Sequence, residues 1–217
     1  MFIVTYGRSG STLLQRVLQT IPGSCVRGEN NGVLFPLFIA WRKLTTAKSK
    51  YGKNRTFPKQ PWWGIDRVKD DVFGRRLAQV FIDIVLRPPA GTRMLGFKEI
   101  RYHEAGNDLP EFLEFLKCSF PDPSFVFLTR NLDDVAKSGW WAKVDETQVR
   151  KSLARAETAF RDFAATNKAV SFSITFEEIL QRDGKLFELF EFLGENLDRA
   201  AVDVVFSEKL SHAPRSG

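Results

Sequence analysis

A glycine-rich turn near the start of the chain constrains the fold more than any other segment. Residues 5–12 read Thr-Tyr-Gly-Arg-Ser-Gly-Ser-Thr and overlap the end of an apolar, β-branched run at 2–6 that is typical of a buried strand. Residues 11–19 then carry apolar side chains at helical spacing. In such a strand–turn–helix unit, backbone N–H groups and the positive end of the helix converge on an anion. The segment therefore predicts a phosphate-binding turn in an α/β protein.

The rest of the chain repeats the alternation of strand and helix. Further strands are predicted at 94–98, 124–129 and 170–176, and helices at 33–44, 66–86, 109–117, 132–141, 148–167 and 177–193. Strands that alternate with helices favour a parallel sheet covered on both faces. A length of 217 residues suits one such unit. We expect a single α/β domain over 1–217, with a central parallel sheet flanked by helices and a P-loop-like topology.

The donor groups of the turn differ from those of the nucleotide-triphosphate P-loop. That motif, G-x-x-x-x-G-K-[S/T], is longer and places a lysine after its second glycine. A kinase or ATPase needs this lysine on the phosphates of its nucleotide. Here Arg8 offers a fork of N–H donors instead, and hydroxyl groups surround Gly10. The predicted contacts for one anionic group are Arg8, Ser9, Gly10, Ser11 and Thr12.

A second candidate anion site follows the strand predicted at 124–129. Arg130 stands at the carboxyl end of that strand, where ligands of open α/β sheets bind. Asn131 can cap the next helix, and Ser138 lies about two turns further on, on a face that can point back toward Arg130. Two separate anion sites in one small fold indicate a ligand that is phosphorylated at two distant positions.

Together these segments resemble sulfotransferases that use 3′-phosphoadenosine-5′-phosphosulfate (PAPS). Residues 6–14 resemble the family's 5′-phosphosulfate loop, in the version with arginine rather than lysine, and 127–140 resemble its 3′-phosphate-binding strand and helix. Residues 176–180, Phe-Glu-Glu-Ile-Leu, are similar to a segment found late in many members. The resemblance implies that a sulfuryl group moves from PAPS to an acceptor hydroxyl and leaves 3′-phosphoadenosine-5′-phosphate. It places the turn on the donor's 5′ side, and Arg130 and Ser138 on its 3′-phosphate.

Sulfuryl transfer, by analogy with phosphoryl transfer, needs a base for the acceptor hydroxyl and positive charge on the transferring group. Glu29 is the predicted base, because a right-handed βαβ crossover can bring it over the phosphate turn. The Gly28-Glu29 pair also resembles one in tyrosylprotein and some bacterial carbohydrate sulfotransferases. Arg8 is expected to keep the carboxylate ionised and, with Lys98, to stabilise developing charge. His103 stays an alternative base, since cytosolic small-molecule sulfotransferases use a histidine after a comparable strand.

The acceptor is expected to bind near an insertion at 42–76 that matches nothing in the family pattern. Residues 48–76 interleave lysine and arginine with tyrosine, phenylalanine and tryptophan. This composition suits sugar rings or an acidic polymer, and equally a solvated loop. A carbohydrate acceptor is the favoured prediction, while a glycolipid, a tyrosine peptide or a small phenol stays open. Basic residues at 209–215 stand where many family members close a loop on the 3′-phosphate.

Composition limits the partners and the location. The formal net charge of +6 indicates an anionic partner without choosing between a nucleotide, a polyanion and a membrane surface. Cys25 and Cys118 stand far apart, so neither a disulfide framework nor a metal site is expected. No signal peptide, membrane span or nucleic-acid motif is recognised, and we expect a cytoplasmic protein. Two other functions stay open, namely a nucleotide-dependent kinase with a degenerate phosphate loop and a non-catalytic binder of bisphosphorylated nucleotides or polyanions.

Overall fold

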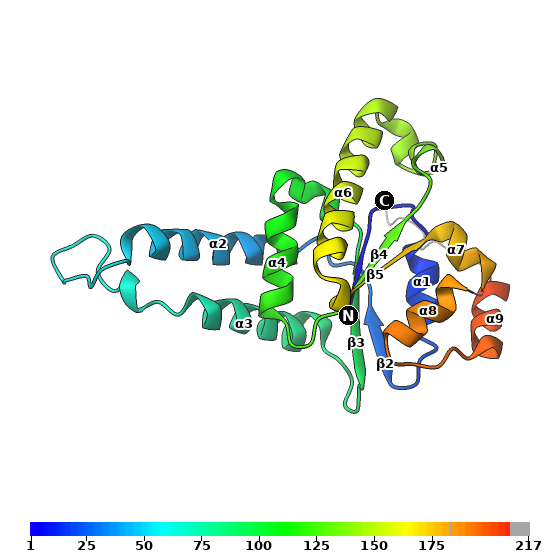
Figure 1. The fold of residues 1–217 in the computed structure, drawn as a ribbon, viewed down its shortest axis with the longest axis horizontal. Helices are drawn as coiled ribbons and strands as arrows, with labels where there is room; N and C mark the ends of the chain where they lie inside the picture. The colour runs from blue at the N-terminus through cyan, green and yellow to red at the C-terminus, as the bar shows by residue number, and fades with distance from the viewer. Residues whose placement is uncertain (183, 209–217) are drawn as a thin grey trace, which may run out of the picture.

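A computed structural model describes residues 1–182 and 184–208, and its centre is a parallel sheet with the strand order β2-β3-β1-β4-β5 (Figure 1). The strands are β1 (Phe2–Val4), β2 (Ser24–Arg27), β3 (Met94–Glu99), β4 (Phe125–Thr129) and β5 (Ser171–Thr175). The α/β class, the parallel sheet and the four predicted strands are confirmed. The sequence analysis missed β2, because Cys25 and Val26 are its only apolar residues and so short a run has no readable period.

Helices connect the strands and cover the sheet. They are α1 (Ser11–Leu18), α2 (Leu34–Tyr51), α3 (Asp70–Val80), α4 (Leu109–Ser119), α5 (Leu132–Ala136), α6 (Glu146–Thr166), α7 (Phe176–Gln181), α8 (Lys185–Phe192) and α9 (Arg199–Ser207). Shorter helical turns are η1 (Ile65–Arg67), the π-helical η2 (Phe81–Leu86), η3 (Tyr102–Asp108), η4 (Trp141–Lys143) and η5 (Lys168–Val170).

Several predicted helix boundaries were wrong, and backbone conformation explains two of them. The helix predicted at 132–141 ends at Ala136, and Gly139 just beyond it has a φ of 58°. The helix predicted at 177–193 breaks at Arg182, which has a φ of 59°, so α7 and α8 are separate. Left-handed residues of this kind stop a helix, but an arginine gives no sequence signal for one. The helix predicted at 33–44 continues to Tyr51, and α9 was not predicted.

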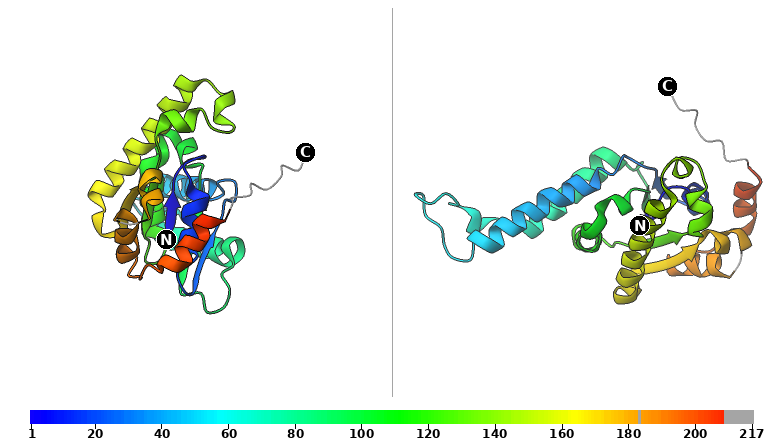
Figure 2. Two further views of the ribbon diagram at one scale, coloured as in Figure 1. Left: turned by 90° about the vertical axis from the view of Figure 1, so that its right-hand side faces the viewer. Right: turned by 90° about the horizontal axis from the view of Figure 1, so that it is seen from above.

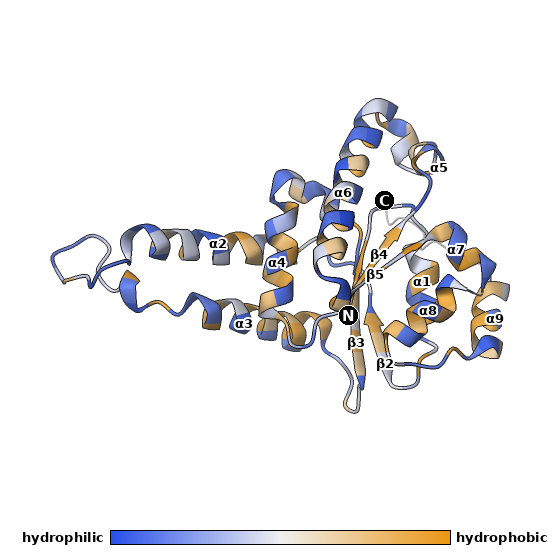
Figure 3. Ribbon diagram, viewed as in Figure 1, coloured by the Kyte–Doolittle hydropathy of each residue, from blue (hydrophilic) through white to orange (hydrophobic). Residues whose placement is uncertain are grey.

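Side chains that alternate in direction along the strands form two hydrophobic cores, one on each face of the sheet. Phe2 and Val4 of β1 join a core that includes buried residues of α2, α3, α4 and α6, whereas Ile3 joins a core with α1, α7, α8 and α9. Successive side chains of a strand point to opposite faces, so both faces of the sheet are covered. Figure 3 shows apolar residues along the strands and on the helices beside them.

The helices α2 and α3 form an antiparallel hairpin that projects from the sheet (Figures 1 and 2). A methyl group at Gly74 of α3 would lie 3.1 Å from the Trp41 ring, so the two helices pack closely there. Trp41 Nε1 donates to the Asp70 carbonyl at 3.1 Å, and the Lys48 ammonium pairs with the Asp70 carboxylate at 2.6 Å. The predicted insertion at 42–76 forms the outer part of this hairpin. Hydropathy falls along α2 from the sheet toward the tip (Figure 3).

Candidate active site

The phosphate turn joins β1 to α1 at the carboxyl edge of the sheet. Arg8 and Gly10 have φ values of 70° and 85°, which curl the backbone tightly before the helix begins. Gly10 caps α1 without a side-chain hydrogen bond, and the first turn of α1 has no acidic residue. The N–H groups of Ser11 and Thr12 therefore have no partner within the helix and add to its positive end. The turn can therefore accept an anion.

The hydroxyl of Ser9 supports the turn from inside. It is fully buried and hydrogen-bonded to the Thr5 hydroxyl at 2.7 Å, while Thr5 donates to the Leu128 carbonyl of β4 at 2.7 Å. Because the Leu128 carbonyl can only accept, the single hydroxyl proton of Thr5 is donated to it, and the Ser9 hydroxyl must donate to Thr5. The side chain of Ser9 thus ties the turn to the neighbouring strand, and its backbone remains part of the anion cradle.

Two aromatic rings pack directly against the glycines of the turn. A methyl group added at Gly7 would lie 2.2 Å from the Trp140 ring, and one at Gly10 would lie 2.1 Å from the Phe176 ring. Trp141 Nε1 also donates to the Gly7 carbonyl at 3.0 Å. Close packing therefore requires glycine at both positions, and Gly10 is required for its backbone conformation as well. Neither Trp140 nor Trp141 was among the predicted site residues, although Trp140 ends the segment 127–140 that resembles the 3′-phosphate-binding strand and helix.

The two predicted anion sites adjoin in the structure. Arg130 Nη1 donates to the Arg8 carbonyl at 3.2 Å, and Arg8 Nε donates to Ser138 Oγ at 3.0 Å. Ser138 lies after the end of α5 rather than inside a helix, so it contacts Arg8 from a loop. The Arg130 guanidinium stacks over Phe176, 4.6 Å from the ring centroid. Its buried Nε has no hydrogen-bond partner among the described residues, so the guanidinium retains a free donor.

The backbone of Arg130 is held by a tyrosine that the sequence analysis did not assign to the site. The Tyr6 hydroxyl is 3.0 Å from the Arg130 backbone nitrogen and 2.5 Å from Glu157 Oε1. Burial and the Glu157 carboxylate raise the pKa of Tyr6 far above its usual value, so its hydroxyl stays protonated. Burial raises the pKa of Glu157 as well. Tyr6 therefore links α6 to the carboxyl end of β4, where Arg130 lies.

Glu29 and Lys98 meet because β2 and β3 are neighbouring parallel strands. Arg27, the last residue of β2, pairs with Phe97, so the chain brings Glu29 beside Lys98 just beyond the pairing. Lys98 Nζ donates to Glu29 Oε1 at 2.5 Å; the lysine is buried and the carboxylate is about one-third exposed. Arg101 Nη1 lies 3.5 Å from the second carboxylate oxygen. The cations in contact with Glu29 are thus Lys98 and Arg101, whereas Arg8 pairs with Ser138.

A second, buried carboxylate fixes the loop that carries Glu29. Glu99 Oε2 accepts the backbone N–H of Gly32 at 2.7 Å, and Oε1 accepts that of Ile100 at 2.8 Å and Arg101 Nη1 at 3.1 Å. On the other side, Gln15 Nε2 of α1 donates to the Val26 carbonyl at 2.9 Å. Glu99 thus attaches the segment after β2 to β3, and Gln15 attaches β2 itself to α1.

A cavity of about 560 Å³ lies beside the turn and the Glu29 carboxylate. Its lining consists of Gly7, Glu29, Ile100, Arg101, His103, Glu104, Trp140 and Trp141. The His103 ring packs edge-on against Trp141, and Nδ1 donates to the Ile100 carbonyl at 3.2 Å. Burial lowers the pKa of His103, which favours the neutral ring with an unprotonated Nε2. The structure therefore brings both candidate bases, Glu29 and His103, to one cavity.

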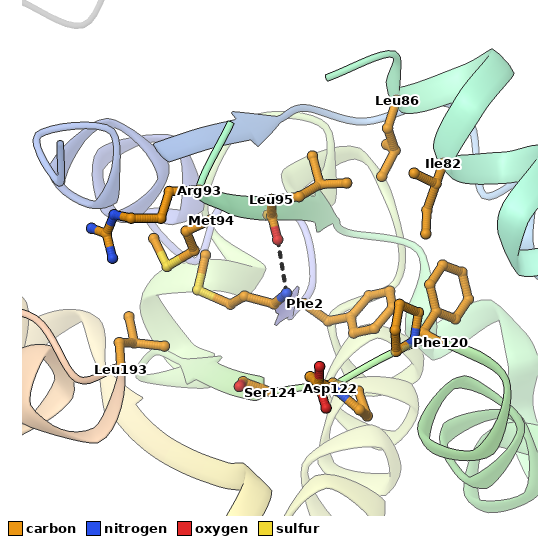
Figure 4. Close-up of a pocket in the computed structure, with 14 residues that line it drawn as sticks. Phe2, Ile82, Leu86, Arg93, Met94, Leu95, Phe120, Asp122, Ser124 and Leu193 are labelled. Carbon is orange, nitrogen blue, oxygen red and sulfur yellow. Dashed lines mark hydrogen bonds between the residues drawn. The ribbon is translucent and has the colours of Figure 1, made fainter. Parts of the chain in front are cut away.

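Another cavity, of about 290 Å³, opens at the amino edge of the sheet (Figure 4). Its lining is mainly apolar and includes Phe2, Leu86, Leu95 and Phe120, and the Met1 ammonium donates to the Leu95 carbonyl there at 2.8 Å. It contains none of the predicted site residues. Parallel strands place the active groups at their carboxyl ends, so this cavity lies at the end away from the phosphate turn.

Some expectations concern other parts of the chain. The basic residues at 209–215 lie outside the described residues. Over residues 1–182 and 184–208, no cluster of His, Cys, Asp and Glu could hold a metal ion. In the same ranges no helix has the length and apolar character to cross a bilayer. Cys25 is a buried free thiol and Cys118 an exposed one.

Comparisons with known proteins are consistent with this geometry. Residues 1–199 match the profile described as the sulfotransferase family. A solved sulfotransferase domain from the curacin biosynthetic pathway superposes with a TM-score of 0.56 at 15% identity, covering 96% of this chain and 77% of that one. At this identity the likeness shows the fold. A thymidylate kinase from Candida albicans superposes with a TM-score of 0.46 at 13% identity, covering 89% of this chain and 92% of that one. No curated protein matches the chain in sequence.

Proposed function

The chain belongs to the sulfotransferase family, and on that premise we propose that it transfers a sulfuryl group from PAPS to a hydroxyl group of a carbohydrate. The observation that carries the proposal is that Glu29, which lines a cavity beside the phosphate turn, contacts the buried ammonium of Lys98. A carboxylate, a buried ammonium and an anion cradle are the groups that sulfuryl transfer requires.

The residues present suit a donor with phosphate groups on both sides of a nucleoside. The open amides at the start of α1 and the guanidinium of Arg8 would hold the 5′ side. Arg130, whose buried Nε lacks a partner in the described part of the chain, would hold the 3′-phosphate together with Ser138. Bound PAPS would supply the sulfuryl group on a phosphate leaving group.

The catalytic roles follow from the contacts of each group. Glu29 would take the proton of the acceptor hydroxyl as its oxygen forms the new bond to sulfur and the bond from sulfur to the 5′-phosphate breaks. Lys98 and Arg8 would stabilise the negative charge that develops on the sulfuryl oxygens and the leaving phosphate. In the structure Lys98 and Arg101 contact the two carboxylate oxygens of Glu29. Lys98 would therefore shift from Glu29 toward the sulfuryl group during the reaction.

The cavity supports a ring-shaped, hydroxylated acceptor. Trp140 and Trp141 offer apolar ring surface, while Arg101 and Glu104 add polar groups to the lining. Stacked aromatic rings with polar groups at the edges suit a sugar. The two unpaired cysteines fit a reducing compartment, so we propose a cytoplasmic enzyme.

A calorimetric titration tests the donor site. Wild-type protein is titrated with 3′-phosphoadenosine-5′-phosphate, ADP and ATP, and the series is repeated on R130A. Arg182 provides the matched control, because its guanidinium also stacks over a phenylalanine, 4.5 Å from the Phe206 ring, far from the turn in sequence. We expect selective binding of the 3′,5′-bisphosphate that R130A loses and R182A keeps. Equal binding of ATP would favour a kinase, and labelled PAPS with a panel of sugars then tests transfer.

A further inference from the structure

Lysine and arginine are concentrated at the end of the α2–α3 hairpin, and one of these residues, Lys48, pairs with Asp70 of α3. We call residues 48–69 the hairpin tip. It contains a single acidic residue, Asp66, so its net charge equals the +6 of the whole chain and the remainder is neutral overall. Its basic residues are Lys48, Lys50, Lys53, Arg55, Lys59, Arg67 and Lys69. Solubility alone does not explain such concentration, since a charge excess serves solubility anywhere on the surface.

The hairpin tip also exposes large aromatic side chains. Phe57 and Trp63 are each 55% exposed, and Trp62 is 43% exposed. Tyr51 and Trp62 stack at 4.1 Å between ring centroids. The Arg55 guanidinium lies 5.8 Å from the centre of the Phe57 ring, so cation and ring share one surface. Exposed aromatic side chains among basic residues mark a surface that binds another partner.

Internal hydrogen bonds give the hairpin tip a defined shape. The buried Thr56 hydroxyl bonds to Asp66 and accepts the N–H of Gly64 at 2.9 Å. Gln60 Oε1 accepts the N–H of Phe57 at 2.7 Å. The one carboxylate and this amide oxygen are therefore engaged within the tip. A carboxylate and an amide oxygen are groups that a protein uses to bind sugar hydroxyls, so two such groups of the tip are already occupied, while its aromatic rings remain exposed.

We propose that the hairpin tip binds the surface of a lipid bilayer that contains anionic lipids. Tryptophan and tyrosine favour the headgroup region of a bilayer, and phenylalanine can enter the acyl boundary beside it. Each Lys or Arg near an anionic surface strengthens binding about fivefold, the equivalent of ~1 kcal/mol. The α2 helix, at 18 residues, is roughly 27 Å long, and Figure 2 shows that the hairpin extends away from the sheet. None of the residues that line the catalytic cavity belongs to the hairpin. Binding at the tip therefore leaves the cavity open, and this proposal does not rest on the proposed function.

A soluble acidic polymer is the rival partner, and the exposed rings argue against it. Phosphate or sulfate groups would satisfy the lysines and arginines, but they would leave Phe57 and Trp63 in water. A bilayer interface takes up both kinds of group at once, because its anionic headgroups lie above apolar chains. The observations thus favour the membrane surface.

Sedimentation with lipid vesicles tests the proposal on the full chain. We expect binding to vesicles of phosphatidylcholine with phosphatidylserine, weak binding to phosphatidylcholine alone, and loss of binding as salt rises. Brominated lipids in the same vesicles should quench tryptophan fluorescence, and W62F/W63F should remove that quenching. No binding to anionic vesicles, or binding without quenching of Trp62 and Trp63, would overturn the proposal.

Matched variants separate the tip from the rest of the surface. K53E/K59E should lower vesicle affinity by at least about 25-fold at low salt, whereas K151E/K168E, at exposed lysines elsewhere, should have a much smaller effect. F57S should weaken binding, and F187S, which removes an aromatic ring 47% exposed on α8, should not. Circular dichroism checks that each variant is folded. Binding to heparin in place of vesicles, or equal losses in both charge variants, would contradict membrane docking by the tip.

Discussion

Lys98 Nζ donates a hydrogen bond to Glu29 Oε1 at 2.5 Å, although the two residues are 69 positions apart in sequence. The contact depends on the pairing of β2 with β3, which places Glu29, just beyond the end of β2, beside Lys98 near the end of β3. Glu99 then fixes the intervening loop by accepting the Gly32 N–H. This arrangement joins a candidate base to a buried cation at the edge of the phosphate turn, and the first prediction concerns the base.

Replacing Glu29 by glutamine should abolish sulfuryl transfer with little change in shape. Glutamine can still accept a hydrogen bond from Lys98 but cannot take a proton, so we expect turnover to fall about 10²–10⁴-fold. Binding of 3′-phosphoadenosine-5′-phosphate should persist in calorimetry. E188Q, at a glutamate that is 52% exposed on α8 and outside the cavity, is the control and should stay near wild-type activity. Full activity in E29Q, together with loss of activity in H103N, would show that His103 is the base.

The burial of His103 should make stability fall in acid. Its folded-state pKa lies below 6.5, so the unfolded chain binds more protons as the pH falls through and below 6.5. The contribution of the neutral ring is thus complete above pH 6.5 and is lost as the pH falls toward the folded pKa. Urea unfolding on both sides of pH 6.5 measures the slope, and H103N should flatten it while keeping a donor for Ile100. Parallel slopes for the two proteins would show that His103 is not buried.

A methyl group at Gly10 should destabilise the turn more than the same change at another left-handed glycine. Gly64 has a φ of 92° and open space around its Cβ position, so G64A reports the backbone strain alone, ~1–2 kcal/mol. G10A adds a contact of 2.1 Å with the Phe176 ring, and we expect a further cost of roughly 1–3 kcal/mol. Urea unfolding measures both variants. Similar values would mean that Phe176 moves freely away from the turn.

Loss of the Tyr6 hydroxyl should weaken both the fold and the predicted 3′-phosphate site. Y6F leaves Glu157 and the Arg130 backbone N–H without their buried partner, which costs roughly 1–3 kcal/mol. The bisphosphate should bind more weakly, because Arg130 loses its anchor. Y6F/E157M should recover part of the stability, since removing both members of a buried pair costs less than removing one. If Y6F alone is neutral in urea unfolding, the hydroxyl does not hold Arg130.

Much of the site could be located from sequence because its parts are local. The phosphate turn lies within eight consecutive residues, and Arg130 follows directly after an apolar strand, so both can be found without any tertiary contact. The helix ends at Ala136 and just before Arg182 could not be predicted from sequence, because they depend on left-handed residues, one of which is an arginine. The aromatic wall of Trp140 and Trp141 was missed for a related reason. These two rings contact Gly7, although more than 130 residues separate them from it in sequence. Nothing in the sequence spacing indicates that contact.

The amino-acid sequence by itself determined the α/β class, the parallel sheet and the glycine-rich turn before the first helix, because each follows from periodicity and from glycines at a strand end. Tertiary structure alone decided that Glu29 meets Lys98, that Arg8 bonds Ser138, and that His103 shares the cavity. The tertiary structure also places the basic residues of the hairpin tip away from the sheet. These relationships depend on strand order and on the direction of α2. Both are set by the burial of apolar faces over the whole chain, which no single segment encodes.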